Sequence, residues 1–179
     1  MAGRARRLTR PADLRKALGI PSDYGLRRRL PRHREASRLV GVGRNPDRQP
    51  VRLAPRAAIA WSRMRAAAQQ DRIILVPLSG YRSASRQAAI IRRKLAAGQK
   101  LAEVLKWIAA PGYSQHHTGR AIDIGAPGKA ALAQDFGRTR QGRWLRRRAH
   151  EFGFVMTYPR KNSHGIGYEP WHWYWLATG

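Results

Sequence analysis

The stretch RAIDIG, from Arg120 to Gly125, decides how the chain is expected to fold. In a short strand its side chains alternate, so Ile122 and Ile124 share one face while Ala121 and Asp123 share the other. The isoleucine face is the one that would enter a core. The carboxylate of Asp123 then projects from the opposite face, beside the small side chain of Ala121.

A second alternating stretch, EPWHWYWL, runs from Glu169 to Leu176. One face of this strand carries Trp171, Trp173 and Trp175. Burial of the tryptophans leaves His172 on the opposite face. Pro170 biases Glu169 toward an extended backbone three residues before that histidine. The stretch therefore predicts a strand with a histidine on its open face and a carboxylate at its entrance.

Helices and strands are expected in mixed order around these two stretches. Helices are predicted over residues 55–70, 83–97, 100–109 and 142–152, because these segments have helical apolar spacing, capping residues or closing glycines. Apolar runs at 73–79 and 154–159 predict strands. No regular βαβ repeat occurs, so the order favours the α+β class over a doubly wound sheet.

The chain divides by composition near residue 50. Residues 1–50 are basic and broken by Pro, Gly and Asn, which predicts a loosely structured arm with one short helix that closes at Gly19. Residues 51–179 hold most of the regular elements and form the expected main domain. A length of 179 residues with 42% apolar residues suits one core.

Several classes of protein are excluded by the composition. There are no cysteines, which excludes disulfides and thiolate zinc sites. No run approaches the roughly 20 apolar residues that cross a bilayer. The basic N-terminus has no apolar segment behind it, so it is not a recognisable secretory signal. We expect either a cytoplasmic protein or one that is released, or reaches the periplasm, by a non-standard route.

The net charge of +26 attracts polyanions. Candidate partners are anionic envelope polymers, acidic lipid surfaces and nucleic acid, and a plain solvated basic surface is the simpler alternative. The charge is spread along the chain, and no helix-turn-helix or zinc-finger spacing occurs. Nucleic acid is therefore the less favoured partner.

The histidines and carboxylates of the two stretches can converge. His116 lies seven residues before Asp123, and a turn permitted by Gly119 would fold it back against that carboxylate. Two histidines and one carboxylate suit a catalytic zinc ion, which needs three protein ligands and an open position for water. A further carboxylate, Glu169, would serve as general base. Arg82, at the exit of the 73–79 strand, would face developing negative charge.

The motifs as a whole resemble a known family. SQHHTGRAID (Ser114–Asp123) fits Ser-x-His-x-x-Gly-x-Ala-x-Asp, and EPWH fits Glu-x-x-His. SGYRS (Ser79–Ser83), followed by Gln87, precedes them in the expected order. Together they resemble the zinc D-alanyl-D-alanine carboxypeptidases and dipeptidases of the LAS group, named for lysostaphin, D-Ala-D-Ala metallopeptidases and sonic hedgehog. The resemblance covers about residues 73–176 and implies that residues 51–179 are a zinc metallopeptidase catalytic domain.

The resemblance implies a small central antiparallel sheet flanked by helices, one zinc ion per chain and peptidoglycan stem peptides as substrate. It implies that His116, Asp123 and His172 are the metal ligands, Glu169 the base, and Arg82 the group that steadies the substrate carbonyl. Ser114 would lie by the terminal carboxylate of the substrate, and Trp171 would shape the pocket.

Several alternatives stay open at this point. His117 could replace His116 as a ligand, and His164 could line the cleft. A nucleic-acid-binding protein and a non-catalytic zinc module of the same fold are the alternative functions. The bond that is cut, whether by a carboxypeptidase, a dipeptidase or an endopeptidase, and the oligomeric state are not fixed by the sequence.

Overall fold

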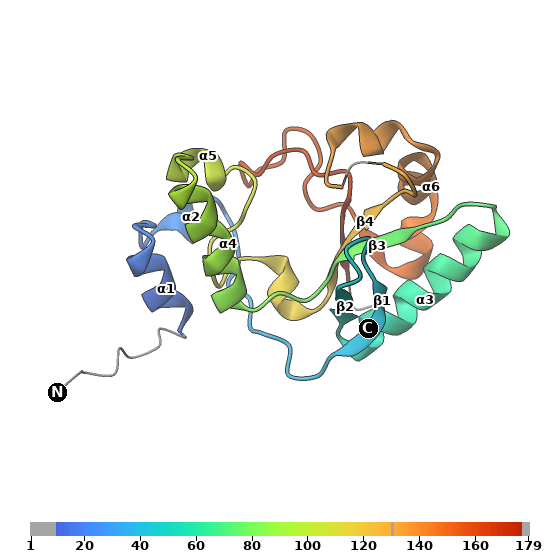
Figure 1. Ribbon diagram of the computed structural model, residues 1–179, viewed down its shortest axis with the longest axis horizontal. Coiled ribbons are helices and arrows are strands. Elements are labelled where there is room, and N and C mark those ends of the chain that lie inside the picture. The colour runs from blue at the N-terminus through green and yellow to red at the C-terminus, as the bar shows by residue number, and fades with distance from the viewer. Residues whose placement is uncertain (1–9, 130, 177–179) are drawn as a thin grey trace.

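The AIDIG stretch forms strand β4 (Ala121–Gly125) inside a four-stranded antiparallel sheet. The strand order is β3 (Val76–Ser79), β4, β6 (His172–Trp175) and β5 (Phe154–Val155). Each neighbouring pair runs antiparallel. The expected α+β class with a small antiparallel sheet is therefore confirmed in this computed structural model, which describes residues 10–129 and 131–176 (Figure 1).

One face of the sheet is covered by two helices, α3 (Pro55–Gln70) and α6 (Arg140–Arg148). Trp61 and Met64 of α3 and Trp144 of α6 are buried in one cluster with the apolar side chains of the strands. Those strand residues are Ile122, Ile124, Trp173 and Trp175. The alternation of both stretches is thus confirmed: their apolar faces make the core, and the opposite face of the sheet is left for Asp123 and His172. We call this part the sheet region.

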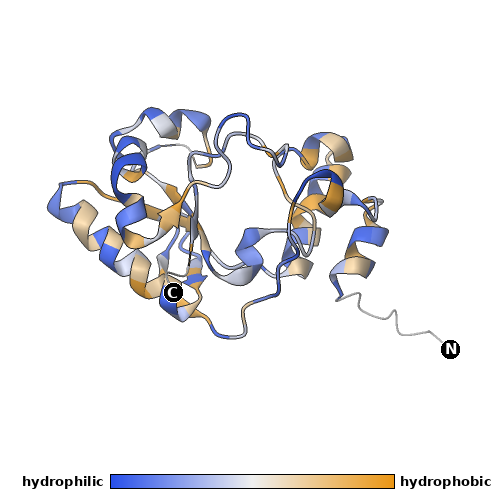
Figure 2. Ribbon diagram, turned by 180° about the vertical axis from the view of Figure 1, so that it is seen from behind, coloured by the Kyte–Doolittle hydropathy of each residue, from blue (hydrophilic) through white to orange (hydrophobic). Residues whose placement is uncertain are grey.

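A second cluster of buried side chains is built from helices and the turns next to them, and it includes no strand residue. It joins α1 (Pro11–Ala17) and α2 (Tyr24–Arg27) to α4 (Ala84–Ala96) and α5 (Leu101–Val104). Its members include Leu14, Leu18, Tyr24, Ala88, Ile91 and Val104. This helical region lies beside the sheet region (Figure 1), and apolar residues occur in both (Figure 2). The N-terminal helices thus pack on α4 and α5 through a shared core.

The sequence analysis predicted no strand within residues 1–50, but residues 40–53 form a hairpin. Strand β1 (Val40–Arg44) pairs antiparallel with β2 (Pro50–Leu53). The turn is closed by Asn45, whose side-chain oxygen accepts from the Gln49 N–H at 2.8 Å. β1 contains two glycines and is mostly exposed, so it lacks the apolar alternation that marks a strand.

The division of the chain at residue 50 remains a prediction, but the hairpin crosses that position. From residue 10 onward the N-terminal part packs on α4, since Leu14 and Leu18 are 3% and 6% exposed. This packing differs from the loose arm that was expected. The apolar residues that make it possible are few and widely spaced, so they form no clear periodic pattern.

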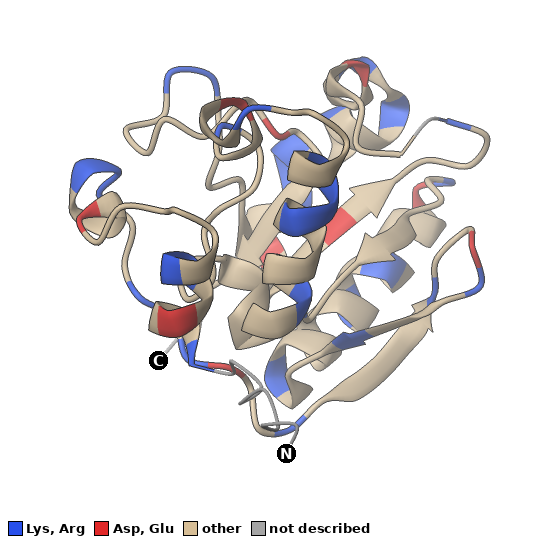
Figure 3. Ribbon diagram, turned by 60° about the vertical axis from the view of Figure 1, so that its left-hand side comes forward, with Lys and Arg blue, Asp and Glu red and all other residues tan. Residues whose placement is uncertain are grey.

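Three 3₁₀ segments complete the described elements: η1 (Gln115–Thr118), η2 (Gln134–Arg138) and η3 (Ala149–Phe152). None of the described helices has the length and apolar character needed to cross a membrane. Lys and Arg occur on helices, strands and loops across the view in Figure 3. The positive charge is therefore spread over the fold, as the sequence predicts.

Candidate metal centre

The sheet register places Asp123 beside His172. The two residues are directly paired across β4 and β6, on the face that points away from the tryptophan core. The His172 Nδ1 and the Asp123 Oδ1 are 3.0 Å apart. Both side chains are buried. The contact between a histidine and a carboxylate from two distant stretches is thus a direct result of strand alternation and pairing.

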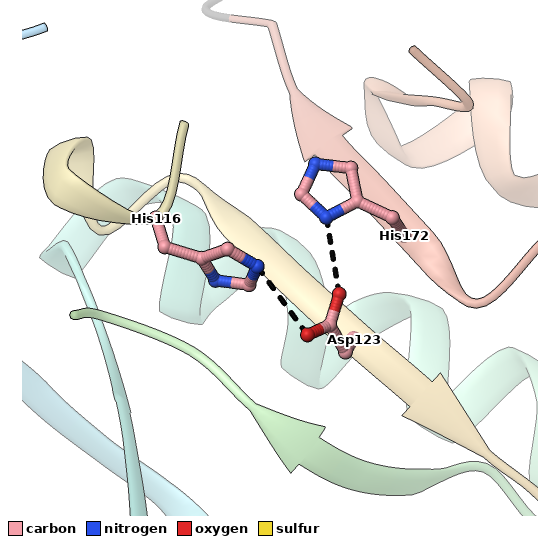
Figure 4. A group of neighbouring side chains, drawn as sticks. All are labelled: His116, Asp123 and His172. Atoms are coloured by element: carbon pink, nitrogen blue, oxygen red, sulfur yellow. Dashed lines mark hydrogen bonds and ion pairs between the residues drawn. The ribbon is translucent and has the colours of Figure 1, made fainter. Parts of the chain in front are cut away.

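His116 reaches the same carboxylate from the turn before β4. The turn closes at Gly119, whose φ of +65° favours glycine, and a Cβ there would lie 2.8 Å from the backbone nitrogen of Ala54. The His116 Nε2 lies 3.3 Å from the Asp123 Oδ2. One ligand atom from each of His116, Asp123 and His172 falls within 4.8 Å of the others. Figure 4 shows both imidazoles pointing at the carboxylate.

Two neutral imidazoles leave the hydrogen-bonding groups of this cluster unbalanced. The other nitrogen of each ring also faces an oxygen: His116 Nδ1 lies 2.6 Å from the Gly80 carbonyl, and His172 Nε2 lies 2.9 Å from Gln115 Oε1. A neutral imidazole carries one proton, so two rings supply two protons for four nitrogen–oxygen contacts. The remaining two nitrogens direct lone pairs toward Asp123. A divalent metal held between these atoms fits this donor set.

The protonation of His116 and Asp123 supports the same conclusion. Burial is the main influence on His116 and lowers its pKa to about 4, so its imidazole is neutral near pH 7. Burial acts to raise the pKa of Asp123, but its contacts with His116 and His172 hold it well below its usual range. A neutral imidazole and an ionised carboxylate are the forms that bind a metal.

Glu169 is a second buried carboxylate, close enough to interact with the cluster. Burial and the Asp123 charge together raise its pKa to about 9, while the Arg82 charge acts to lower it. Its backbone N–H donates to the Tyr158 carbonyl at 3.1 Å, and its own carbonyl accepts from the His172 N–H at 3.1 Å. The first turn before β6 therefore fixes Glu169 next to His172.

Arg82 follows the exit of β3 and is held by both its backbone and its side chain. Its N–H donates to the His116 carbonyl at 3.1 Å. Its guanidinium donates to Gln87 Oε1 at 3.0 Å and lies 3.8 Å from Asp123 Oδ2. The side chain is 18% exposed. A cation is thereby fixed at the edge of the cluster.

The N-terminal segment contacts the turns that carry Arg82 and His116. The Glu35 carboxylate accepts from the Tyr81 hydroxyl at 2.6 Å and from the Ala84 N–H at 2.8 Å. The Ala36 N–H donates to the His117 carbonyl, and the His33 N–H to the Gly112 carbonyl, both at 2.8 Å. We call residues 33–36 the strap. It joins the helical region to the loops of the site.

His117 is not part of the cluster. Its Nε2 accepts from the Gly112 N–H at 3.0 Å, and its Nδ1 donates to the Arg82 carbonyl at 2.6 Å. This neutral ring satisfies both nitrogens, so it has no lone pair left for a metal. His164 also lies apart from the cluster, with its Nδ1 3.1 Å from the Arg28 carbonyl.

Two further predicted residues have a clear structural setting. Ser114 is buried directly before η1. Trp171 is 6% exposed and packs in the core of the sheet region, and its carbonyl accepts from the Ile124 N–H at 2.9 Å. Packing accounts for Trp171 without a substrate. Substrate contacts for either residue remain predictions.

The sequence analysis missed Gln115, which contacts His172 through the Oε1 described above. Gln115 stands between Ser114 and His116, at a position that the motif leaves unspecified. Gln87 was noted as part of the pattern, but its contact with Arg82 was not foreseen. Neither residue has a periodicity or charge that would have identified it. Its place beside a ligand in the sequence is the one signal that pointed to Gln115.

Comparison with solved structures finds the same fold in proteins that are 26–30% identical in sequence. An LD-carboxypeptidase, LdcB, superposes with a TM-score of 0.72 at 30% identity, covering 82% of this chain and 71% of that one. VanYB in complex with D-alanine-D-alanine superposes with a TM-score of 0.63 at 27% identity, covering 82% and 81%. A vancomycin-resistance D,D-pentapeptidase VanY in complex with Zn(II) gives 0.62 at 26% identity, covering 83% of each chain.

The curated relatives carry the same kind of names as the structural neighbours. The D-alanyl-D-alanine carboxypeptidase of Enterococcus faecalis is 30% identical over 143 residues, 74% of this chain and 50% of the relative. The bifunctional D-Ala-D-Ala dipeptidase and carboxypeptidase VanXYC of Enterococcus gallinarum is 30% identical over 133 residues, 71% of this chain and 68% of the relative. The chain spans about half the length of the first curated relatives it matches.

A family model carries the assignment across most of the chain. The model described as VanY, D-alanyl-D-alanine carboxypeptidase, matches residues 50–178. That range contains every residue of the cluster together with Arg82 and Glu169. The chain therefore belongs to the VanY family of D-alanyl-D-alanine carboxypeptidases.

Proposed function

We propose that this chain is a zinc-dependent carboxypeptidase that removes the terminal D-alanine from peptidoglycan stem peptides ending in D-Ala-D-Ala. The observation that carries the proposal is the buried cluster of His116, Asp123 and His172, with the buried carboxylate of Glu169 beside it. When both rings are neutral and their outer nitrogens donate, neither inner nitrogen has a proton for its contact with Asp123. Relatives named as D-alanyl-D-alanine carboxypeptidases and a neighbour in complex with Zn(II) support zinc and this substrate.

In this proposal His116, Asp123 and His172 hold the ion. When bound there, zinc supplies Lewis acidity, which polarises a carbonyl and makes water a better nucleophile at neutral pH. Glu169 takes a proton at its carboxylate and returns it to the leaving amine. The Asp123 charge is one cause of the raised pKa of Glu169. Neutralising that charge favours the ionised Glu169, which is the form that accepts a proton.

Arg82 and Ser114 would position the substrate. The Arg82 guanidinium is fixed by Gln87 at the edge of the cluster, where it can face the oxygen on which negative charge develops. Ser114 lies two residues before His116 in the chain, and its proposed contact is the terminal carboxylate. Because the site residues are largely buried, little water competes with these interactions.

The proposal also includes the partner of the enzyme and the compartment in which it acts. A net charge of +26 supports an anionic polymer of the cell envelope as a partner. The same charge would hold the protein near its substrate. Whether it acts on cell-wall precursors in the cytoplasm or on the wall after release remains a prediction.

The proposal is tested by mass spectrometry of products after incubation of the zinc-loaded protein with purified muropeptides. We expect loss of one alanine residue from a pentapeptide that ends in D-Ala-D-Ala, and no change in a tetrapeptide that ends in a single D-Ala. The matched control is Glu169→Gln, which should bind zinc and leave the pentapeptide intact. Loss of the dipeptide would indicate an endopeptidase or dipeptidase-like cut, and no product from any muropeptide would reject the proposal.

A further inference from the structure

His172 has two ring nitrogens with different partners, and the partner of the outer one determines what the inner one can do. The inner nitrogen, Nδ1, points into the cluster at Asp123. The outer nitrogen, Nε2, lies 2.9 Å from the amide oxygen of Gln115. An oxygen accepts, so Nε2 must carry the proton. Nδ1 is then left with its lone pair in the cluster.

Thr157 holds the Gln115 amide in place. Its hydroxyl donates to the same Oε1 at 2.8 Å, so the oxygen of Gln115 accepts from two groups. A reversed amide would present N–H groups to Nε2 instead. The proton of His172 would then move to Nδ1, where it would face Asp123 and block the position needed by a metal.

The equivalent contact of His116 is built from backbone. Its outer nitrogen, Nδ1, donates to the Gly80 carbonyl at 2.6 Å, and no side-chain substitution removes that acceptor. The acceptor for His172 is a side chain that can be changed or reversed. The two ligands of the cluster thus differ in how securely their tautomer is fixed.

We propose that Gln115, held by Thr157, is a positioning residue that fixes His172 as the Nε2–H tautomer and thereby prepares its Nδ1 to bind the metal. The inference rests on the metal site of the proposed function. Gln115 touches neither substrate nor reacting atoms in this account. Its effect should therefore appear first in metal affinity, since acceptors that orient ligand histidines typically contribute 10–100-fold.

The test is a zinc competition titration with a chromophoric chelator and no peptide present. Gln115→Met keeps the length of the side chain and loses the acceptor, and should raise the zinc dissociation constant about 10–100-fold. Gln115→Glu keeps an oxygen that can only accept, and should bind zinc within about 3-fold of the wild-type protein or more tightly. Gln69→Met, on the exposed side of α3, is the matched control and should change nothing.

The tautomer itself is measured in the metal-free wild-type protein by long-range proton–nitrogen NMR of the His172 ring. The expected spectrum is that of a ring protonated on Nε2, shifting toward a mixture of tautomers in Gln115→Met. Thr157→Val should weaken zinc binding less, by about 2–10-fold, because Gln115 remains but is free to rotate.

Three results would overturn the inference. The first is unchanged zinc affinity in Gln115→Met. The second is an equal weakening in Gln115→Met and Gln115→Glu, which would show that an acceptor oxygen alone does not replace the amide. The third is an Nδ1–H tautomer in the wild-type protein. None of these measurements uses a peptide. A protein that binds zinc as expected but cleaves no muropeptide would therefore reject the proposed function and leave this inference intact.

Discussion

The sheet region and the helical region both contribute to the site, but in different ways. The sheet region carries Asp123 and His172 on paired strands, so its contribution is fixed by register. The helical region begins with α1 and α2 and reaches the site through backbone and carboxylate contacts of the strap, residues 33–36. The sheet region presents reactive groups, whereas the helical region supports the loops that present the others. Substitutions in the two regions should therefore change different measurements.

The largest expected effect is on catalysis in the sheet region. Glu169→Gln removes the proposed base and should lower kcat by about 10²–10⁴-fold, which is the usual contribution of a general base. Zinc content should stay at one ion per chain, because Glu169 is not among the three ligand candidates. Steady-state kinetics and metal analysis of the same sample check both statements. A variant that retains full kcat would show that another group takes the proton.

Core substitutions test most directly whether both regions are well packed. Ile122→Ala in the sheet core and Leu14→Ala in the helical core should each lower the free energy of unfolding by about 2–5 kcal/mol, because both side chains are buried among apolar neighbours. Denaturant unfolding measures both. A change below about 0.5 kcal/mol for Leu14→Ala would mean that the N-terminal part is the loose arm expected from the sequence.

This contrast explains what could be predicted from the sequence. Strand alternation is local, so RAIDIG and EPWHWYW revealed which side chains face the core and which face the site. The convergence of His116 with them needed only a turn at Gly119. The packing of residues 10–50 depends on contacts between segments far apart in the chain, such as Glu35 with Tyr81. No local pattern encodes those contacts, and the family motifs do not extend to them.

In the metal-free protein, the raised pKa of Glu169 should make the free energy of unfolding depend on pH. Its pKa is raised from the ordinary 4.5 to about 9 in the folded state, so the folded chain binds a proton that the unfolded chain has lost. This stabilisation is complete below about pH 4.5 and is lost as the pH rises through 9, with a slope of at most about 1.4 kcal/mol per pH unit.

Glu169→Gln carries no such proton, so it provides the reference. The difference in unfolding free energy between the wild-type protein and Glu169→Gln should be small at pH 5 and should move by a few kcal/mol in favour of the variant by pH 9. Denaturant titrations of both metal-free proteins across this range measure it. A difference that stays constant with pH would contradict the raised pKa.

The smallest expected effect tests whether the contacts of the strap stabilise the loops of the site. Glu35→Ala removes the acceptor for the Tyr81 hydroxyl and the Ala84 N–H, on both sides of Arg82. Glu35 is exposed, so we expect a loss of about 1 kcal/mol in unfolding free energy. The same loosening should lower kcat/KM by a factor of about 3–10, since 1.4 kcal/mol corresponds to tenfold.

Glu35→Gln keeps one acceptor oxygen and should recover part of both losses, whereas Asp47→Ala, in the exposed turn of the β1–β2 hairpin, should change stability by less than about 0.5 kcal/mol. Zinc affinity should be the same in all three variants. The strap contacts residues next to Arg82 and His116, and it contacts none of the ligand atoms. If Glu35→Ala weakens zinc binding as much as Gln115→Met does, the two regions cannot be separated by function. The helical region would then hold the metal ligands as directly as the sheet does.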